Sequence, residues 1–238
     1  MPKVAIVAAL EREVRPLIQR WHLVEKDHGK YRFRFFENDH AVLVCAGIGA
    51  EAARRAAEAV IALYAPEIVY SAGFAGALEN RLKVGDLVLP RWVVNAGDGS
   101  RVELHDGTGV LVSFGTIASP AQKVSLRNSF SAQAVDMEAA AVARAAEARG
   151  IKFAVVKAIS DELGFVLPPM DQFIDSEGQF SEWRFAAHMA VRPWLWPRVL
   201  RLARNTRRAS RTICDWLGKL DMSATEQPTS AQEGVKRV

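Results

Sequence analysis

Residues 3–20 read KVAIVAALEREVRPLIQR, and this stretch contains the two patterns that decide the fold class. Lys3–Leu10 is almost entirely apolar, which is typical of a core strand. In Glu11–Arg20, which follows without a break, the apolar residues recur at helical spacing. A core strand that leads directly into a helix favours an α/β protein with a mostly parallel sheet covered by helices.

The alternation of strands and helices continues to residue 161. Further strands are expected at Tyr31–Glu37, His40–Cys45, Ile68–Ala72, Asp86–Leu89, Trp92–Val94, Val110–Phe114 and Phe153–Ser160. Helices are expected at Ala50–Tyr64 and Val135–Arg149. Between these elements, the glycine content predicts a turn at Gly73–Gly76 and a hairpin or loop at Asn95–Gly109.

The composition is that of a globular protein. The chain has 238 residues and is 50% hydrophobic, which suffices for one buried core with a tail. It has no run of about 18 apolar residues, so we expect no membrane-spanning helix. The N-terminus lacks a long cleavable apolar region, and we interpret it as a core strand rather than a signal peptide. Cys45 and Cys214 lie far apart in the sequence, which suits a reducing cytoplasm.

Three carboxylates occupy positions where chemistry is expected. Glu13 and Asp161 follow predicted strands, and ligands of open α/β sheets bind outside the carboxyl ends of the strands. Glu138 opens a helix that otherwise consists of Ala and Val, so its side chain needs a partner or a ligand. The alternative for each is an acid that caps a helix or occupies its first turn.

Six segments together carry a resemblance to a known family. They are Val7–Val14, Ala46–Gly49, Gly73–Gly76, Lys83–Asp86, Asp136–Ala139 and Ala158–Asp161. In this order they resemble the purine nucleoside phosphorylase and methylthioadenosine/S-adenosylhomocysteine nucleosidase superfamily, over roughly residues 3–161. The resemblance implies a three-layer α/β/α fold with a central mixed, mostly parallel sheet. It also implies cleavage of the N-glycosidic bond of a purine nucleoside.

The same resemblance implies a role for each of the main site residues. Such a reaction passes through a sugar cation while the departing base gains negative charge. By position, Asp161 is the acid that protonates or hydrogen-bonds purine N7, with Ser160 beside it. Glu138 would hold the ribose hydroxyls, with Met137 against the sugar. Glu13 would activate the attacking water.

Further residues are assigned to the pocket wall, with two departures from the family pattern. Gly76 would line the sugar and base, and Ile117 and Ala118 would lie near the adenine edge. Lys157 stands where nucleosidases carry an arginine, and Phe74 where they carry a serine. Lys157 could steady a water through Glu13, contact phosphate, or form a structural ion pair.

The identity of the nucleophile has two readings. Glu11–Glu13 resembles the hydrolytic branch, which favours water, since an anionic Glu13 would repel phosphate. The alternative is a phosphate-dependent purine nucleoside phosphorylase, with Arg12, Arg15 and Lys157 offsetting that charge. A third, different class is a nucleoside-binding or membrane-scaffold protein without activity. We expect no metal and no cofactor, with phosphate only as a co-substrate of a phosphorylase, and the resemblance implies a dimer or larger homo-oligomer.

The C-terminal region is basic and amphipathic. Its basic residues are Arg192, Arg198, Arg201, Arg204, Arg207, Arg208, Arg211 and Lys219, against the single acid Asp215. Leu195, Val199, Leu202, Thr206, Ala209, Ile213 and Trp216 form one mostly apolar helical stripe. This pattern suits either an anionic bilayer surface or packing on the core or on a second subunit. Nucleic acid is not favoured, because no recognised motif accompanies the charge.

These features suggest a branch of the family and a division of the chain. With the segment Ala190–Pro197, the tail resembles the branch associated with hopanoid biosynthesis, which implies removal of adenine from an adenosyl-linked triterpenoid lipid. The Asn95–Gly109 region is shorter than usual in the family, so we expect an open 5′ side. We expect a catalytic domain over residues 1–190, a helical tail over 191–222 and disorder over 223–238.

Overall fold

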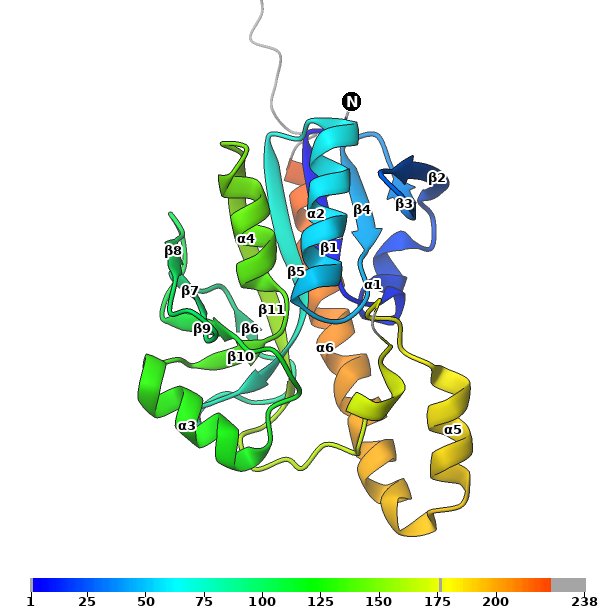
Figure 1. The fold of residues 1–238 in the computed structure, drawn as a ribbon, viewed down its shortest axis with the longest axis vertical. Helices are drawn as coiled ribbons and strands as arrows, with labels where there is room; N and C mark the ends of the chain where they lie inside the picture. Colours follow the sequence, from blue (N-terminus) through cyan, green and yellow to red (C-terminus); the bar gives the residue numbers. More distant parts are fainter. Residues whose placement is uncertain (1, 176, 224–238) are drawn as a thin grey trace, which may run out of the picture.

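The structure, a computed structural model, describes residues 2–175 and 177–223, and it is a three-layer α/β/α fold (Figure 1). One mixed sheet forms the central layer. Helices α2 and α4 cover one of its faces, and α1 and α6 cover the other. The predicted fold class is therefore confirmed. In the described ranges, every helix is too short or too polar to cross a bilayer.

The described strands form a sheet in which β5 is central. The strands are β1 (Val4–Ala8), β2 (His22–His28), β3 (Tyr31–Glu37), β4 (Ala41–Cys45), β5 (Ile68–Ala77), β6 (Leu87–Val88), β7 (Trp92–Asn95), β8 (Arg101–Glu103), β9 (Val110–Ser113), β10 (Ala134–Asp136) and β11 (Lys152–Asp161). Their order is β2-β3-β4-β1-β5-β10-β9-β7-β8, and β11 pairs with β5 and β6. Since β1 and β11 both run parallel to β5, their carboxyl ends meet at one edge.

The helices connect these strands on both faces. They are α1 (Glu11–Ile18), α2 (Ala50–Tyr64), α3 (Pro120–Phe130), α4 (Ala139–Glu147), α5 (Glu182–Ala190) and α6 (Trp196–Ser223), with short 3-10 turns η1 (Asp171–Phe173) and η2 (Pro193–Leu195). Figure 1 shows α5 and the first part of α6 extending beyond the sheet.

Strand β1 shows why the sequence folds in this way. Its side chains alternate between the faces of the sheet. Ala5 and Val7 pack in the cluster that contains α2 and α4, whereas Ile6 and Ala8 pack in the cluster that contains α1 and α6. Both faces are covered, so the strand is apolar throughout rather than alternating with polar residues.

Two segments differ from the sequence-based expectation. Gly73–Gly76 does not form a turn but continues strand β5. A Cβ on Gly73 would lie 2.6 Å from Oε2 of Glu13, so glycine is needed because a side chain approaches the strand there. Residues 135–138 precede the helix rather than belonging to it, because Ala134–Asp136 pairs with β9. The amide of Ala139 then donates to the Asp136 carboxylate at 2.9 Å, where α4 begins.

The other predicted strands and helices are present, and some elements were not predicted. The Asn95–Gly109 region contains the predicted hairpin, with β7 and β8 paired antiparallel. Strand β2 and helix α3 were missed, and the tail predicted to be helical over residues 191–222 contains the short turn η2 before α6. The region assigned to disorder lies, from residue 224 onward, outside the described residues.

The C-terminal helix is part of the core rather than a separate appendage. Ala209, Ile213 and Leu217 are buried in the cluster that also contains β1 and α1. Trp216 packs edge-on against Tyr70 of β5, with ring centroids 5.9 Å apart. The apolar stripe of this helix therefore faces the protein, which was one of its two expected partners.

We predict that Ile213→Ala lowers the free energy of unfolding by about 2–5 kcal/mol, because it deletes a fully buried side chain. Urea denaturation followed by circular dichroism measures this change. The matched control is Leu200→Ala in the same helix, where the side chain is 59% exposed and a change within about 0.5 kcal/mol is expected. Equal effects of both substitutions would show that α6 is not packed as described.

Candidate active site

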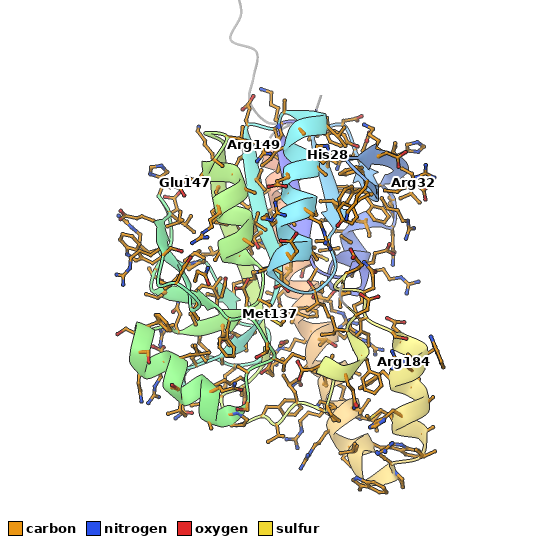
Figure 2. All side chains as sticks on the ribbon, in the orientation of Figure 1. His28, Arg32, Met137, Glu147, Arg149 and Arg184 are labelled. Carbon is orange, nitrogen blue, oxygen red and sulfur yellow. The ribbon has the colours of Figure 1, made fainter. Side chains whose placement is uncertain are left out.

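The predicted site residues meet in one cavity of about 590 Å³ at the carboxyl ends of β1, β5 and β11. All of them except Lys157 line it, namely Glu13, Phe74, Gly76, Ile117, Ala118, Met137, Glu138, Ser160 and Asp161. In Figure 2, Met137 marks this place near the centre of the molecule, beside the start of α4. In residues 2–175 and 177–223, no three or more His, Cys, Asp or Glu side chains are grouped so that they could hold a metal ion.

Glu13 is held in the first turn of α1 and is almost inaccessible, at 5% exposure. Among the described residues, its Oε2 atom has no hydrogen-bond partner. Burial, followed by the charge of Glu138, raises the pKa of Glu13 to about 7, although Lys157 and Arg12 oppose the shift. A carboxyl group with such a pKa can accept a proton from a substrate near neutral pH.

Glu138 is fixed by backbone donors from two segments. Its Oε1 accepts a hydrogen bond from the Gly49 amide at 2.9 Å, and its Oε2 accepts one from the Met137 amide at 3.2 Å. The Gly47–Gly49 turn thus binds an anion, but that anion is a side chain of the protein itself. Burial raises the pKa of Glu138, while Lys157 acts in the opposite direction.

Lys157 forms an ion pair in the interior and does not line the cavity. Its ammonium lies 2.8 Å from Oδ2 of Asp136, and both side chains are almost fully buried. Burial alone would lower the pKa of Lys157, but Asp136, Glu138 and Glu13 outweigh burial and raise it. The structure therefore shows the ion pair that was one of the alternatives for Lys157. The positive charge of Lys157 compensates three buried carboxyl groups.

Asp161 ends β11 and accepts hydrogen bonds at both oxygens. Ser160 Oγ donates to Oδ1 at 2.7 Å, and the Lys123 ammonium pairs with Oδ2. Lys123 also donates to the Glu162 carbonyl at 3.0 Å. A Cβ on Gly76 would lie 3.1 Å from both Oδ2 of Asp161 and Cε of Lys123, so this glycine makes room for the ion pair.

Lys123 was not predicted as a site residue, although the sequence contains a signal for its position. Ser119 and Gln122 form a capping box at the start of α3, and Pro120 occupies the first turn. This pattern places Lys123 one turn into a helix that follows β9. The lysine is 1% exposed, and a buried lysine requires a partner in the interior.

The cavity continues outward along α5 and α6 with an apolar wall. This wall contains Leu167, Met170, Phe180, Phe185, Val199, Leu202 and Ala203. Arg12 also lines the cavity, and its guanidinium lies 5.1 Å from the ring centroid of Phe180. The space beside the carboxylates is therefore bounded by residues between 167 and 185 and by α6, and not by residues 95–109, which were expected to determine its openness.

Comparisons with known proteins identify relatives along most of the chain. The family model described as the phosphorylase superfamily matches residues 3–114 and 100–190. The chain is 26% identical over 197 residues to a 5′-methylthioadenosine/S-adenosylhomocysteine nucleosidase from Buchnera aphidicola, covering 67% of this chain and 85% of that one. An aminodeoxyfutalosine nucleosidase from Campylobacter jejuni is 24% identical over 200 residues, with coverages of 69% and 87%.

Solved structures share the fold. A methylthioadenosine/S-adenosylhomocysteine nucleosidase from Colwellia psychrerythraea, in complex with adenine, has a TM-score of 0.61 at 26% identity, over 68% of this chain and 83% of that chain. The corresponding enzyme from Neisseria meningitidis, in complex with methylthio-immucillin-A, has a TM-score of 0.69 at 19% identity. The match covers 94% of this chain and 100% of that chain.

We predict that the Glu13 carboxyl group of the ligand-free protein titrates at a pH of about 7. Glu138→Gln should lower this pKa, because it removes the neighbouring negative charge that raises it. Carbon-detected NMR of side-chain carboxyl groups measures both values. Glu67→Gln, at an exposed glutamate paired with Lys3, should leave the titration unchanged. A Glu13 titration near pH 4.5 would contradict the burial described here.

Proposed function

The chain belongs to the phosphorylase superfamily, and we propose that it hydrolyses the N-glycosidic bond of an adenine nucleoside. One observation carries the proposal: Glu13, Glu138 and Asp161 line a single cavity at the carboxyl edge of the sheet. Relatives of the chain are named as nucleosidases, and one related structure holds adenine.

The proposed mechanism divides the work among these three side chains. Asp161, oriented by Ser160, donates a proton to N7 so that the purine departs as a neutral base. Glu138 binds the ribose hydroxyls close to the developing sugar cation, with Met137 beside it. Glu13 accepts a proton from the water that attacks the anomeric carbon. Gly76, Phe74, Ile117 and Ala118 form the surrounding wall.

Water is the nucleophile that the electrostatics favour. Lys157 is paired with Asp136 and does not line the cavity, so it is not available to bind phosphate. The charge of Glu138 raises the pKa of Glu13, and two carboxyl groups lining one cavity disfavour a phosphate dianion there. These contacts support a nucleosidase over the phosphorylase alternative.

The apolar outer wall of the cavity favours a large, apolar 5′ substituent. Phe185, Val199 and Leu202 continue the cavity beyond the carboxylates. An adenosine that carries only a small polar 5′ group would leave this wall in contact with water. We therefore infer that the substrate is a lipid-linked adenosine, consistent with the resemblance to the hopanoid-associated branch.

An enzyme that acts on a lipid-linked substrate must reach a membrane surface, and we propose that the protruding hairpin makes this contact. We define the hairpin as residues 182–204, which comprise α5, η2 and the start of α6. Its exposed apolar side chains are Trp183, Val191, Trp194, Trp196 and Leu200, with Trp183 75% exposed. Arg184, Arg198, Arg201 and Arg204 are also exposed on it. Exposed tryptophans among arginines fit the headgroup layer of an anionic bilayer.

We predict adenine release from methylthioadenosine and, at higher kcat/KM, from a lipid-linked adenosine, both without phosphate. Glu13→Gln should lower the rate by at least about 100-fold, because the general base is lost. Below pH 7, kcat/KM should fall about tenfold per pH unit, because protonated Glu13 cannot accept a proton. Chromatography of released adenine measures these rates. Glu11→Gln, in the same helix but paired with Arg34, is the matched control.

The outcomes separate the alternatives. A strict phosphate requirement would identify a phosphorylase, and no release from any of these substrates by folded protein would favour a binding protein without activity. A preference for methylthioadenosine over the lipid-linked substrate would contradict the lipid assignment alone.

We predict that the protein floats with vesicles that contain phosphatidylglycerol and not with pure phosphatidylcholine vesicles. Arg198→Gln/Arg201→Gln should weaken binding by about 30-fold, since each arginine near an anionic surface contributes about 1 kcal/mol. Trp183→Ser/Trp194→Ser should also weaken vesicle binding. Trp196 is left unchanged in this variant, because its Nε1 donates to the Met189 carbonyl at 2.8 Å.

The matched control is Leu23→Ser/Val124→Ser, which replaces two apolar residues that are 41% exposed on other surfaces. Equal binding by all variants would rule out the hairpin as the contact.

A further inference from the structure

We propose that Lys123 supplies the proton that Asp161 passes to the departing purine, which makes Lys123 a positioning and proton-supplying residue of the site. This inference rests on the proposed function, since it concerns the acid side of the same reaction. It assigns a role to a side chain that lies outside the six segments on which the family resemblance depends.

The position of Lys123 is specific and enclosed. Its side chain is 1% exposed and that of Asp161 is 6% exposed, so the pair lies in the interior. The ammonium contacts Oδ2 of Asp161 and the Glu162 carbonyl. Gly76 lacks the side chain that would separate the two groups. Helix α3 therefore delivers a buried cation directly to the predicted acid.

The hydrogen bonds of Asp161 identify the source of its proton. To protonate N7, this carboxylate must first acquire a proton from a neighbour. Its two described donors are the Ser160 hydroxyl at Oδ1 and the Lys123 ammonium at Oδ2. An ammonium is a much stronger acid than an aliphatic hydroxyl, so the transferable proton is that of Lys123.

The cleavage of the glycosidic bond conserves protons and electron pairs. One ammonium proton moves from Nζ of Lys123 to Asp161, and Asp161 transfers a proton to N7. The bond between C1′ and N9 breaks with its electron pair moving to the purine. The water oxygen bonds to C1′ and loses its proton to Glu13. After product release, Lys123 regains a proton from solvent and Glu13 loses one, so no oxidant or further reactant is needed.

The test compares Lys123→Met and Lys123→Arg on substrates with different leaving groups. Both variants should release adenine from methylthioadenosine at least about 100-fold more slowly than the wild type. Arginine keeps the charge but does not give up a proton, so it should not restore the rate. Both variants should retain activity on 4-nitrophenyl β-D-riboside and on 7-methyladenosine, whose leaving groups need no proton.

The matched control is Lys83→Met, an exposed lysine 3.9 Å from the Glu162 carboxylate, which should release adenine at the wild-type rate. Thermal unfolding checks that each variant is folded. Restoration of adenine release by arginine would overturn the inference, because charge alone would then suffice. Equal losses on every substrate would also overturn it. A wild-type protein that releases no adenine would instead contradict the proposed function.

Discussion

The burial of charged side chains at one end of an apolar sheet is the constraint on which the rest of this structure depends. Removing a charge from water costs several kcal/mol unless partners compensate it. Asp136 and Lys157 compensate each other, and the Gly49 amide binds the Glu138 carboxylate. These contacts fix the ends of β10 and β11 relative to the turn before α2. The site is therefore not an addition to the fold, because its charges determine how neighbouring elements meet.

Much of the fold could be predicted because the core strands are apolar and the helices have a clear period. The secondary-structure predictions were wrong where tertiary contacts override the local conformational preference of the residues. Gly73–Gly76 was expected to be a turn, yet it is a strand that needs glycine because Glu13 and the pair of Lys123 with Asp161 approach its backbone. Val135 was assigned to a helix, but pairing with β9 draws it into the sheet. Glycine content and helical periodicity carry no information about these long-range contacts.

The site was predictable to the extent that its residues occupy the ends of strands. Lys123 was missed because a lysine on a short helix is usually a surface residue, and nothing local shows that Asp161 lies next to it. The stripe on α6 illustrates the same limit. Its period shows that one face of the helix is apolar, but not whether protein or lipid covers that face. In the structure, the core covers the C-terminal part of the stripe, whereas Val199 and Leu202 line the cavity. The exposed tryptophans lie outside the stripe.

Helix α6 joins two regions with different surroundings. Its first turns, with Val199 and Leu202, border the outer cavity, whereas Ile213 and Leu217 lie in the core beside β1. The carboxylates that would act on the glycosidic bond come from other elements. Mutations near the start of α6 can therefore reshape the outer cavity while the three carboxylates and the scaffold remain intact. The shape of the outer cavity and the placement of the carboxylates are thus set by separate parts of the chain.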